Sequence, residues 1–429
     1  YLDNTREHMN NTKYFGNSSR TEGFAGQESR RERDLNLQAL ATYRMTFADI
    51  HHADFLLGYE SLDRNYENLY ATGTHIYNPT GWTVDNTLDN AERNSGGGNL
   101  TNYTTRGIFG RINYDYDSKY FASVSYRRDA SSRFAPDKRW GNFFSVSLAW
   151  DMVKEKFMQS TSTWLDLLKV KASFGQQGND NLGGDYFYGY QDLYRLRGTE
   201  SWSDGQLYVK GNPDLTWETS NAFNAGVDFS FLQGKVAGTV EYFMRQTSDM
   251  LYERPVAPSL GYTQFPMNVG SMRNSGLEIE VNYRPISTRN ITWNVNANLT
   301  YIKNKIIKLN PEAKGRIERG ITIWEEGESM YNYNLVQYMG VNPDTGEAQY
   351  LTRDPILDEK GEQMKDDKGN KLYGEEYITT NYDHANANCR KATGNLLPKV
   401  YGGFGTTIEA YGVDFGIQFS YQLGGRLFD

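Results

Sequence analysis

Residues 291–301 carry a strict two-residue alternation that limits what this chain can fold into. The segment reads Ile-Thr-Trp-Asn-Val-Asn-Ala-Asn-Leu-Thr-Tyr, with an apolar or aromatic residue at every odd position and Thr or Asn at every even one. Because successive side chains of a β-strand point to opposite faces, this strand has one apolar and one polar face. An apolar stripe with aromatic residues toward its ends is typical of a lipid-embedded β-barrel, which is apolar outside and polar inside.

The same alternation recurs along most of the chain, so an ordinary protein core does not account for it. In residues 140–150 the stripe begins at Trp140 and ends at Trp150, and in residues 168–174 it alternates with lysine and serine. The sequence therefore predicts an all-β fold, an antiparallel transmembrane β-barrel, with residues 1–429 forming one partial barrel domain of about 12–14 strands. Further alternating segments lie at 35–45, 108–116, 120–126, 223–229, 236–242, 277–283 and 413–421.

The connections between these segments alternate between short and long. Residues 117–119, 232–235 and 409–412 form tight turns, and residues 152–166 are expected to hold a short helix. Outer-membrane barrels have short periplasmic turns and long extracellular loops, so the long polar connections are predicted to be extracellular. These predicted loops are 62–103, 127–139, 176–216, 246–270 and 303–398, the last being either one large loop or a loop with an additional hairpin.

Charge and residue usage exclude several other classes of protein. The net charge of −8 argues against a nucleic-acid partner, and Cys389, as the single cysteine, excludes an intramolecular disulfide framework and a cysteine-built zinc site. No run of about 18 apolar residues predicts a transmembrane helix. No nucleophile motif or His/Cys cluster has a convincing catalytic context, so we predict no enzyme, no cofactor and no metal site.

Several longer motifs carry a resemblance to a known family. Residues 127–134 read Arg-Arg-Asp-Ala-Ser-Ser-Arg-Phe, residues 212–218 read Asn-Pro-Asp-Leu-Thr-Trp-Glu, and residues 268–278 read Asn-Val-Gly-Ser-Met-Arg-Asn-Ser-Gly-Leu-Glu. Residues 398–404 then read Pro-Lys-Val-Tyr-Gly-Gly-Phe. In this order, from about residue 100 to 429, the chain resembles the barrel of the SusC/RagA family, the TonB-dependent outer-membrane transporters of Bacteroidetes.

The resemblance implies a location in the bacterial outer membrane and a role in nutrient import. It implies a 22-stranded barrel with a plug domain, which is not in this chain, and energy coupling by TonB through an N-terminal region that is also missing. A SusD-like lipoprotein would capture a glycan or oligopeptide ligand, and a dimer of transporter–lipoprotein pairs is left open. Since an open sheet would expose unpaired strand edges to lipid, we expect the chain to be the middle of a larger barrel.

Two groups of residues are candidates for ligand contact. The arginines of the 127–134 motif could bind an anionic ligand or could form a hydrogen-bonded lattice at the loop base. Aromatic side chains in the long loops could stack on sugar rings, or could belong to the interfacial girdle, pack within the loops or contact the lipoprotein. The candidates are Arg127, Arg128 and Arg133, and Trp82, Tyr186, Phe187, Tyr188, Tyr190, Trp202 and Tyr208.

The sequence leaves one alternative to an importer open and argues against another. A passive porin or a barrel adhesin would share the barrel and lack energy coupling. A barrel enzyme, such as a lipase or protease, would need a Ser/His/Asp or Asp/His constellation at the outer rim, and His75 has no obvious partner for that role.

The inner wall of an importer is predicted to carry Arg111, Asn113, Asp115, Glu278, Glu280, Asn294 and Asn296.

Overall fold

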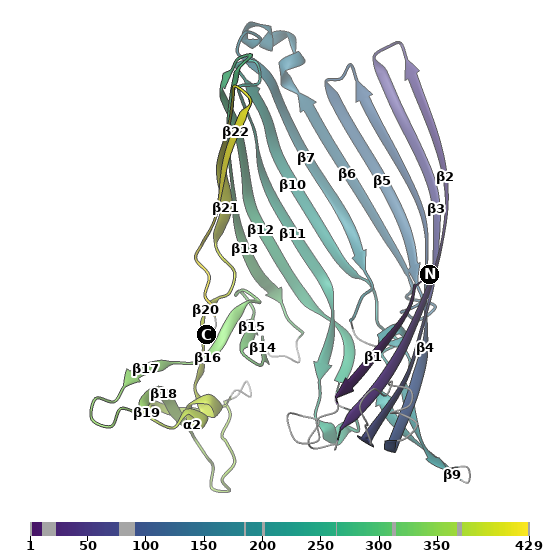
Figure 1. Ribbon diagram of the computed structural model, residues 1–429, viewed down its shortest axis with the longest axis vertical. Helices are drawn as coiled ribbons and strands as arrows, with labels where there is room; N and C mark the ends of the chain where they lie inside the picture. Colours follow the sequence, from purple (N-terminus) through teal and green to yellow (C-terminus); the bar gives the residue numbers. More distant parts are fainter. Residues whose placement is uncertain are drawn as a thin grey trace.

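A single curved wall of antiparallel strands dominates the computed structural model, which describes residues 2–10, 23–76, 91–183, 186–199, 202–262, 264–310, 315–366 and 371–427. Thirteen strands form this wall, which Figure 1 shows as an open half-cylinder. In the described part of the chain, the two outermost strands are hydrogen-bonded on one side only. The predicted fold class, a partial antiparallel barrel without a plug domain, is confirmed. In spatial order the strands are β1 (Leu2–Asn10), β2 (Phe24–Phe47), β3 (His51–Ile76), β4 (Ala91–Tyr116), β5 (Tyr120–Ser131), β6 (Trp140–Asp151), β7 (Leu165–Asn179), β10 (Glu218–Phe231), β11 (Val236–Pro255), β12 (Gln264–Ser287), β13 (Ile291–Lys308), β21 (Val400–Ala410) and β22 (Val413–Leu423).

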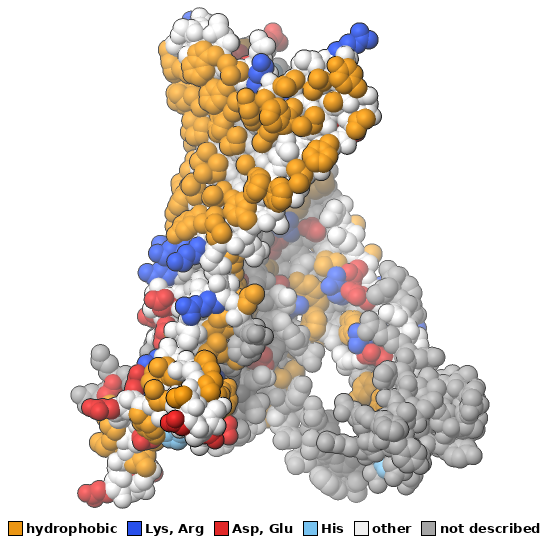
Figure 2. Space-filling view, turned by 60° about the vertical axis from the view of Figure 1, so that its left-hand side comes forward, with side chains coloured by type: hydrophobic (Ala, Val, Ile, Leu, Met, Phe, Trp, Pro, Cys, Tyr) orange, Lys and Arg blue, Asp and Glu red, His pale blue; other side chains and the backbone are white. Residues whose placement is uncertain are grey.

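The outer face of the wall is apolar and exposed, the reverse of a soluble protein. Leu57 of β3 is 62% exposed and Phe415 of β22 is 59% exposed, although both lie within hydrogen-bonded strands of the wall. Figure 2 shows hydrophobic side chains gathered in a broad band over one half of the molecule. An exposed apolar surface of this extent is stable only against another apolar phase, which for such a sheet is the lipid bilayer.

Tight turns close the strands at the end of the wall nearest the apolar band, at the top of Figure 1. Asp117 and Ser118 both have positive φ, 53° and 52°, as the first two residues of the β4–β5 turn. Positive φ at both central residues is the type I′ geometry that matches the twist of a hairpin. The predicted short helix in 152–166 is a pair of 3-10 helices, η2 (Met152–Lys154) and η3 (Lys156–Thr161).

At the opposite end, the strands run further than predicted into the expected loops. β3 and β4 stay paired up to Ile76↔Ala91, and β11 and β12 up to Pro255↔Gln264, so the predicted loops 62–103 and 246–270 are too wide. Likewise, β5, β7 and β13 extend into the predicted loops 127–139, 176–216 and 303–398. Beyond the membrane both faces of a strand meet water, so the apolar alternation stops while the backbone ladder continues.

The expected loops also hold small sheets of their own. Residues 176–216 contain the hairpin β8 (Leu193–Thr199) and β9 (Trp202–Val209), with the 3-10 helix η4 (Tyr186–Tyr188) before it; a further 3-10 helix is η5 (Pro258–Leu260). The 303–398 segment is neither one plain loop nor a single hairpin, because it forms two sheets and a short helix. They are β14 (Arg316–Arg319), β15 (Thr322–Glu325), β16 (Asn332–Val336) and β20 (Arg390–Asn395), then β17 (Tyr338–Val341), β18 (Ala348–Pro355) and β19 (Tyr373–Thr379), with α2 (Tyr382–Asn388).

A compact apolar cluster fastens the four-stranded outer sheet, through Trp324 of β15, to the wall. Tyr252 of β11, Val269 of β12 and Ile306 of β13 pack with Leu309 and Trp324, all 8% exposed or less. The wall therefore continues into a folded layer and not into loose loops. Among the described residues, no helix is long and apolar enough to cross a membrane.

Candidate functional site

The inner face of the wall carries the polar half of each alternating strand. The register places Arg111, Asn113 and Asp115 of β4 on the face opposite Ile108 and Ile112. Glu278 and Glu280 of β12 and Asn294 and Asn296 of β13 share that face. The predicted lumen residues therefore lie together on one side of the sheet.

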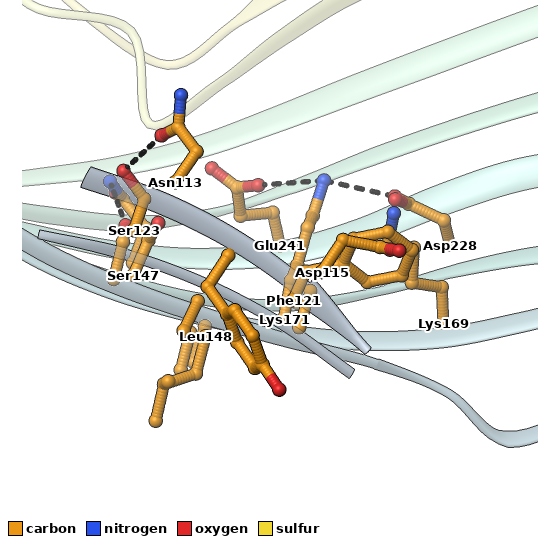
Figure 3. Close-up of a pocket in the computed structure, with 18 of the residues that line it drawn as sticks. Asn113, Asp115, Phe121, Ser123, Ser147, Leu148, Lys169, Lys171, Asp228 and Glu241 are labelled. Carbon is orange, nitrogen blue, oxygen red and sulfur yellow. Dashed lines mark hydrogen bonds and ion pairs between the residues drawn. The ribbon is translucent and has the colours of Figure 1, made fainter. Parts of the chain in front are cut away.

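A charged group spans three neighbouring strands of this inner face. The Lys171 Nζ lies 2.9 Å from Asp228 Oδ1 and 3.3 Å from Glu241 Oε2, as Figure 3 shows. Gly226 is on β10, the central strand, where it pairs with Lys171 on one side and Glu241 on the other, and a Cβ at this position would be 3.2 Å from Lys171 Cε. The missing side chain thus lets the lysine cross β10 and reach the carboxylate on β11.

A cavity of about 550 Å³ surrounds this group on the inner wall (Figure 3). Its lining includes Asn113, Ser123 and Ser147, and Lys169 Nζ lies 4.1 Å above the ring of Phe121. Amides, hydroxyls and paired charges bind water and polar solutes reversibly and supply no activated nucleophile. The wall is therefore suited to line a water-filled path.

A second polar group lies where β4, β5 and β7 leave the apolar band. Asp180 accepts hydrogen bonds from Tyr103 Oη at 2.8 Å and Ser131 Oγ at 2.5 Å, and lies 3.6 Å from Arg133 Nη1. The Arg133 guanidinium lies between the rings of Tyr103, at 4.6 Å, and Phe187, at 5.1 Å. Burial, followed by the Asp180 charge, raises the pKa of Tyr103. This group therefore fixes the strand ends to one another.

The three arginines predicted as one anion site lie in three different settings. Arg127 lies on the inner face, 2.7 Å from Asp129 and 2.9 Å from Glu60. Arg133 belongs to the lattice around Asp180. Arg128 lies on the outer face over the ring of Trp140, at 4.9 Å. Because the guanidinium groups point to different faces, the geometry does not bring them together around one ligand.

The predicted aromatic contacts are only partly within the described residues. Tyr188 Oη accepts a hydrogen bond from the Asn102 backbone N–H at 3.3 Å, so this ring packs against β4. Tyr190 is half-buried beside it in the same connection. Trp82 lies outside the described residues, and the side chains of Tyr186, Trp202 and Tyr208 do as well.

An aromatic seam, formed by Phe134, Phe143 and Trp217, was not predicted from the sequence. The pairing of β6 and β7 stops at Ser145↔Gly175, while the ladders on either side continue further. Phe143 and Trp217 fill this gap edge to face, with ring centroids 5.6 Å apart. Phe134 and Trp217 each stand in one of the motifs quoted above, and Phe143 stands in the alternating segment 140–150, which was the available signal. Only the gap in the hydrogen-bonded pairing shows that the three rings fill one site.

The outer sheets contain a trio that resembles a hydrolase triad. His384 Nδ1 lies 3.0 Å from Thr352 Oγ1, and His384 Nε2 lies 3.2 Å from Asp354 Oδ1. Thr352 is 0% exposed, so no substrate reaches its hydroxyl, and the trio fastens α2 to β18. No cluster of three or more His, Cys, Asp or Glu side chains suitable for a metal ion occurs within the described ranges.

Comparison with known proteins agrees with this geometry. Residues 1–425 match the sequence model of the family described as TonB dependent receptor-like, beta-barrel. The chain is 29% identical over 423 residues to TonB-dependent receptor P39 of Formosa agariphila, and the aligned region covers 92% of this chain and 40% of that protein. It is 33% identical over 240 residues to TonB-dependent receptor SusC of Bacteroides thetaiotaomicron, and this aligned region covers 51% of this chain and 24% of that protein.

The fold is similar to that of a solved transporter. Against the structure of the RagAB peptide transporter, the chain has a TM-score of 0.79 at 24% sequence identity, with 98% of this chain and 44% of that chain covered. The chain therefore spans less than half the length of the relatives named here.

Family, fold and surface chemistry thus agree. An apolar outer band, a polar inner wall and tight turns at one end are what an outer-membrane barrel needs. Barrels of this family lie in the outer membrane and are not enzymes, which confirms the predicted location and the predicted absence of an enzymatic activity. The chain belongs to the TonB-dependent receptor β-barrel family and is similar to its SusC and RagA members.

Proposed function

We propose that this wall is part of an importer that carries a nutrient across the outer membrane, with energy supplied through TonB. The observation that carries the proposal is the two-faced wall, with an apolar band outside and the Lys171–Asp228–Glu241 group inside. A wall of this kind separates lipid from a polar path. The family match over residues 1–425 supports coupling to TonB.

The ligand proposed is a glycan or an oligopeptide. Side-chain amides, hydroxyls and carboxylates line the inner wall and its mouth, and both ligand classes offer matching hydrogen-bond groups. Tyr188 and Tyr190 are the ligand contacts that we propose among the described side chains, together with Trp82, Tyr186 and Trp202. Their rings would stack on sugars or on apolar peptide side chains.

A SusD-like lipoprotein is proposed as the partner on the extracellular side. One face of the outer sheet of β17, β18 and β19 exposes apolar side chains, including Tyr338 at 60% and Val341 at 53%, which pair with Tyr350 and Ala348 on the same side of β18. Apolar side chains grouped outside the membrane support a protein contact. Co-purification of the full receptor with a lipoprotein of this class tests the partner, and substitution of Tyr338 and Val341 by Ser should weaken it.

Uptake by cells that carry the full receptor tests the function. Cells lacking the gene, and the same cells complemented, are given labelled oligopeptides or labelled oligosaccharides, with and without a protonophore. We expect one ligand class to enter only when the receptor and the proton-motive force are both present. Uptake that persists after the force is removed would favour a passive porin, and no uptake of either class together with surface adhesion would favour an adhesin.

Two adjacent substitutions make the test specific to the wall. Ser147 lines the inner cavity, whereas Val146 lies on the outer face and is 38% exposed. Ser147→Trp should obstruct the path and lower uptake, while Val146→Trp adds the same ring on the lipid side and should leave uptake unchanged. Equal uptake by both variants would contradict transport along this wall.

A further inference from the structure

Basic side chains follow the extracellular edge of the apolar band on the outer face. On β2, β4 and β5, the outward stripe of apolar residues ends at Leu35, Ile108 and Tyr126. The next outward position toward the extracellular end of each strand is Arg33, Arg106 and Arg128, all exposed. On β13, Lys303 and Lys305 follow the stripe in the same way. Figure 2 shows Lys and Arg side chains gathered directly below part of the orange band. The chain has a net charge of −8, so its average charge does not explain this distribution.

Two of these arginines differ from their neighbour in having no ion-pair partner within 4 Å in the described part of the chain. Arg127, next in sequence, lies between Glu60 and Asp129 at 2.9 and 2.7 Å. By contrast, within the described part of the chain Arg106 and Arg128 form no ion pair, and the recorded contact of Arg128 is the Trp140 ring, 4.9 Å away. The register pairs Arg106 with Ala130 and Arg128 with Ile108, so the two arginines are diagonal neighbours on one face. They form a site for an anion approaching from the membrane.

An apolar furrow of about 610 Å³ lies next to this pair. Ala41 and Gly110 form its floor, because the register aligns both with Leu57 and neither side chain fills the outer face. Tyr43, Phe55 and Tyr126 are among its walls. Ile108 lines the furrow and is the cross-strand partner of Arg128, so the arginine pair and the furrow adjoin.

We infer that the arginine pair and the furrow together bind a phosphorylated glycolipid of the outer leaflet, with its phosphate on Arg106 and Arg128 and one acyl chain in the furrow. The furrow is continuous with the lipid-facing band, so its occupant is a molecule already in the membrane. The pair lies at the extracellular edge of that band, where the headgroups of the outer leaflet lie. Arginine suits a phosphate, because its planar donors bind two oxygens at once. This inference is independent of which nutrient is transported.

Lipid titration of the full receptor, followed by native mass spectrometry, tests the inference. The receptor is extracted in a non-ionic detergent and titrated with purified lipid A, dephosphorylated lipid A or phosphatidylglycerol. We expect Arg106→Gln and Arg128→Gln each to weaken lipid A binding about five-fold, as expected for one basic residue at a lipid surface. Gly110→Leu should also weaken it by filling the furrow; a Cβ there meets only Leu56 O at 3.5 Å, so the wall tolerates it.

Arg44→Gln is the matched control, because Arg44 is exposed at 84% of its side chain but lies on the inner face. It should bind lipid A as the unmodified receptor does. Heat-dependent mobility on gels confirms that each variant is folded, and dephosphorylated lipid A tests the phosphate contact without any substitution. Unchanged binding by the arginine double variant, equal binding of dephosphorylated lipid A, or equal binding of phosphatidylglycerol would each overturn the inference. If Gly110→Leu changes the oligomeric state of the receptor and leaves lipid binding unchanged, the inference is also overturned, because the furrow would then be a contact with a second barrel.

Discussion

Substitution of Gly178 by alanine tests how the aromatic seam holds β6 and β7 together. A Cβ at Gly178 would lie 2.7 Å from both Cε atoms of Phe143 and 2.1 Å from its Cζ, the last more than an ångström inside ordinary contact. The ring cannot retreat easily, because a Cβ at Gly141 would also meet it at 2.6 Å and Trp217 packs edge-on against it. Phe143 is 7% exposed, so Gly178→Ala overpacks a closed site and should cost about 1–3 kcal/mol.

Urea unfolding of the full receptor in detergent, followed by tryptophan fluorescence, measures this cost. Gly416→Ala is the matched control, since Gly416 lies on β22 and a Cβ there meets only Thr407 Oγ1 at 3.7 Å. Phe143→Leu should relieve part of the clash, so the double variant with Gly178→Ala should lose less stability than the sum of the single variants. If Gly178→Ala unfolds at the same urea concentration as Gly416→Ala, the seam is not a close-packed contact and the reasoning fails.

Three further predictions concern charged and buried groups. Hydrogen bonds from the Lys210 ammonium and the Gly211 N–H lower the pKa of Asp192. The stabilisation from these bonds is therefore present above the ordinary carboxyl range and is lost as pH falls through the folded-state pKa. The protection factor of the Gly211 amide should therefore drop in acid, and Asp192→Asn should abolish that pH dependence; an unchanged profile would refute it. Burial raises the pKa of the Cys389 thiol, which is 1% exposed, so iodoacetamide should label it slowly in the native receptor and rapidly in denaturant; equal rates would contradict the burial. Lys171→Met leaves two carboxylates without their shared cation and should lower stability by about 1 kcal/mol, a loss that adding Glu241→Gln should partly reverse in urea unfolding.

The sequence predicted the faces of the wall better than the lengths of its strands. The inward positions of Arg111, Asn113 and Glu280 follow from a local two-residue period, and the register confirms all three. The ends of β3 and β4 were misplaced, because outside the membrane both faces are wet and alternation no longer marks a strand. Only the hydrogen-bonded pairing up to Ile76↔Ala91 shows where these strands end.

The candidate site depended more heavily on tertiary contacts. Arg127, Arg128 and Arg133 are close in sequence, yet strand alternation and the loop after β5 send them to the inner face, the outer face and the Asp180 lattice. The aromatic residues of the seam come from segments up to 83 residues apart, and no local pattern predicts that they meet. Closeness in the sequence therefore identified candidate residues but did not show which of them lie together in the fold.

By itself, the sequence determined that this chain forms a membrane barrel wall, because side-chain alternation and turn residues act over a few positions and need no distant partner. The tertiary structure decided what the wall carries. The Lys171 group needs three strands in one register. The four-stranded outer sheet forms only if β16 pairs with β20 across the whole β17–β19 insertion. The furrow needs Ala41 and Gly110 to be aligned on separate strands. Such features arise only when long-range pairing fixes which residues become neighbours.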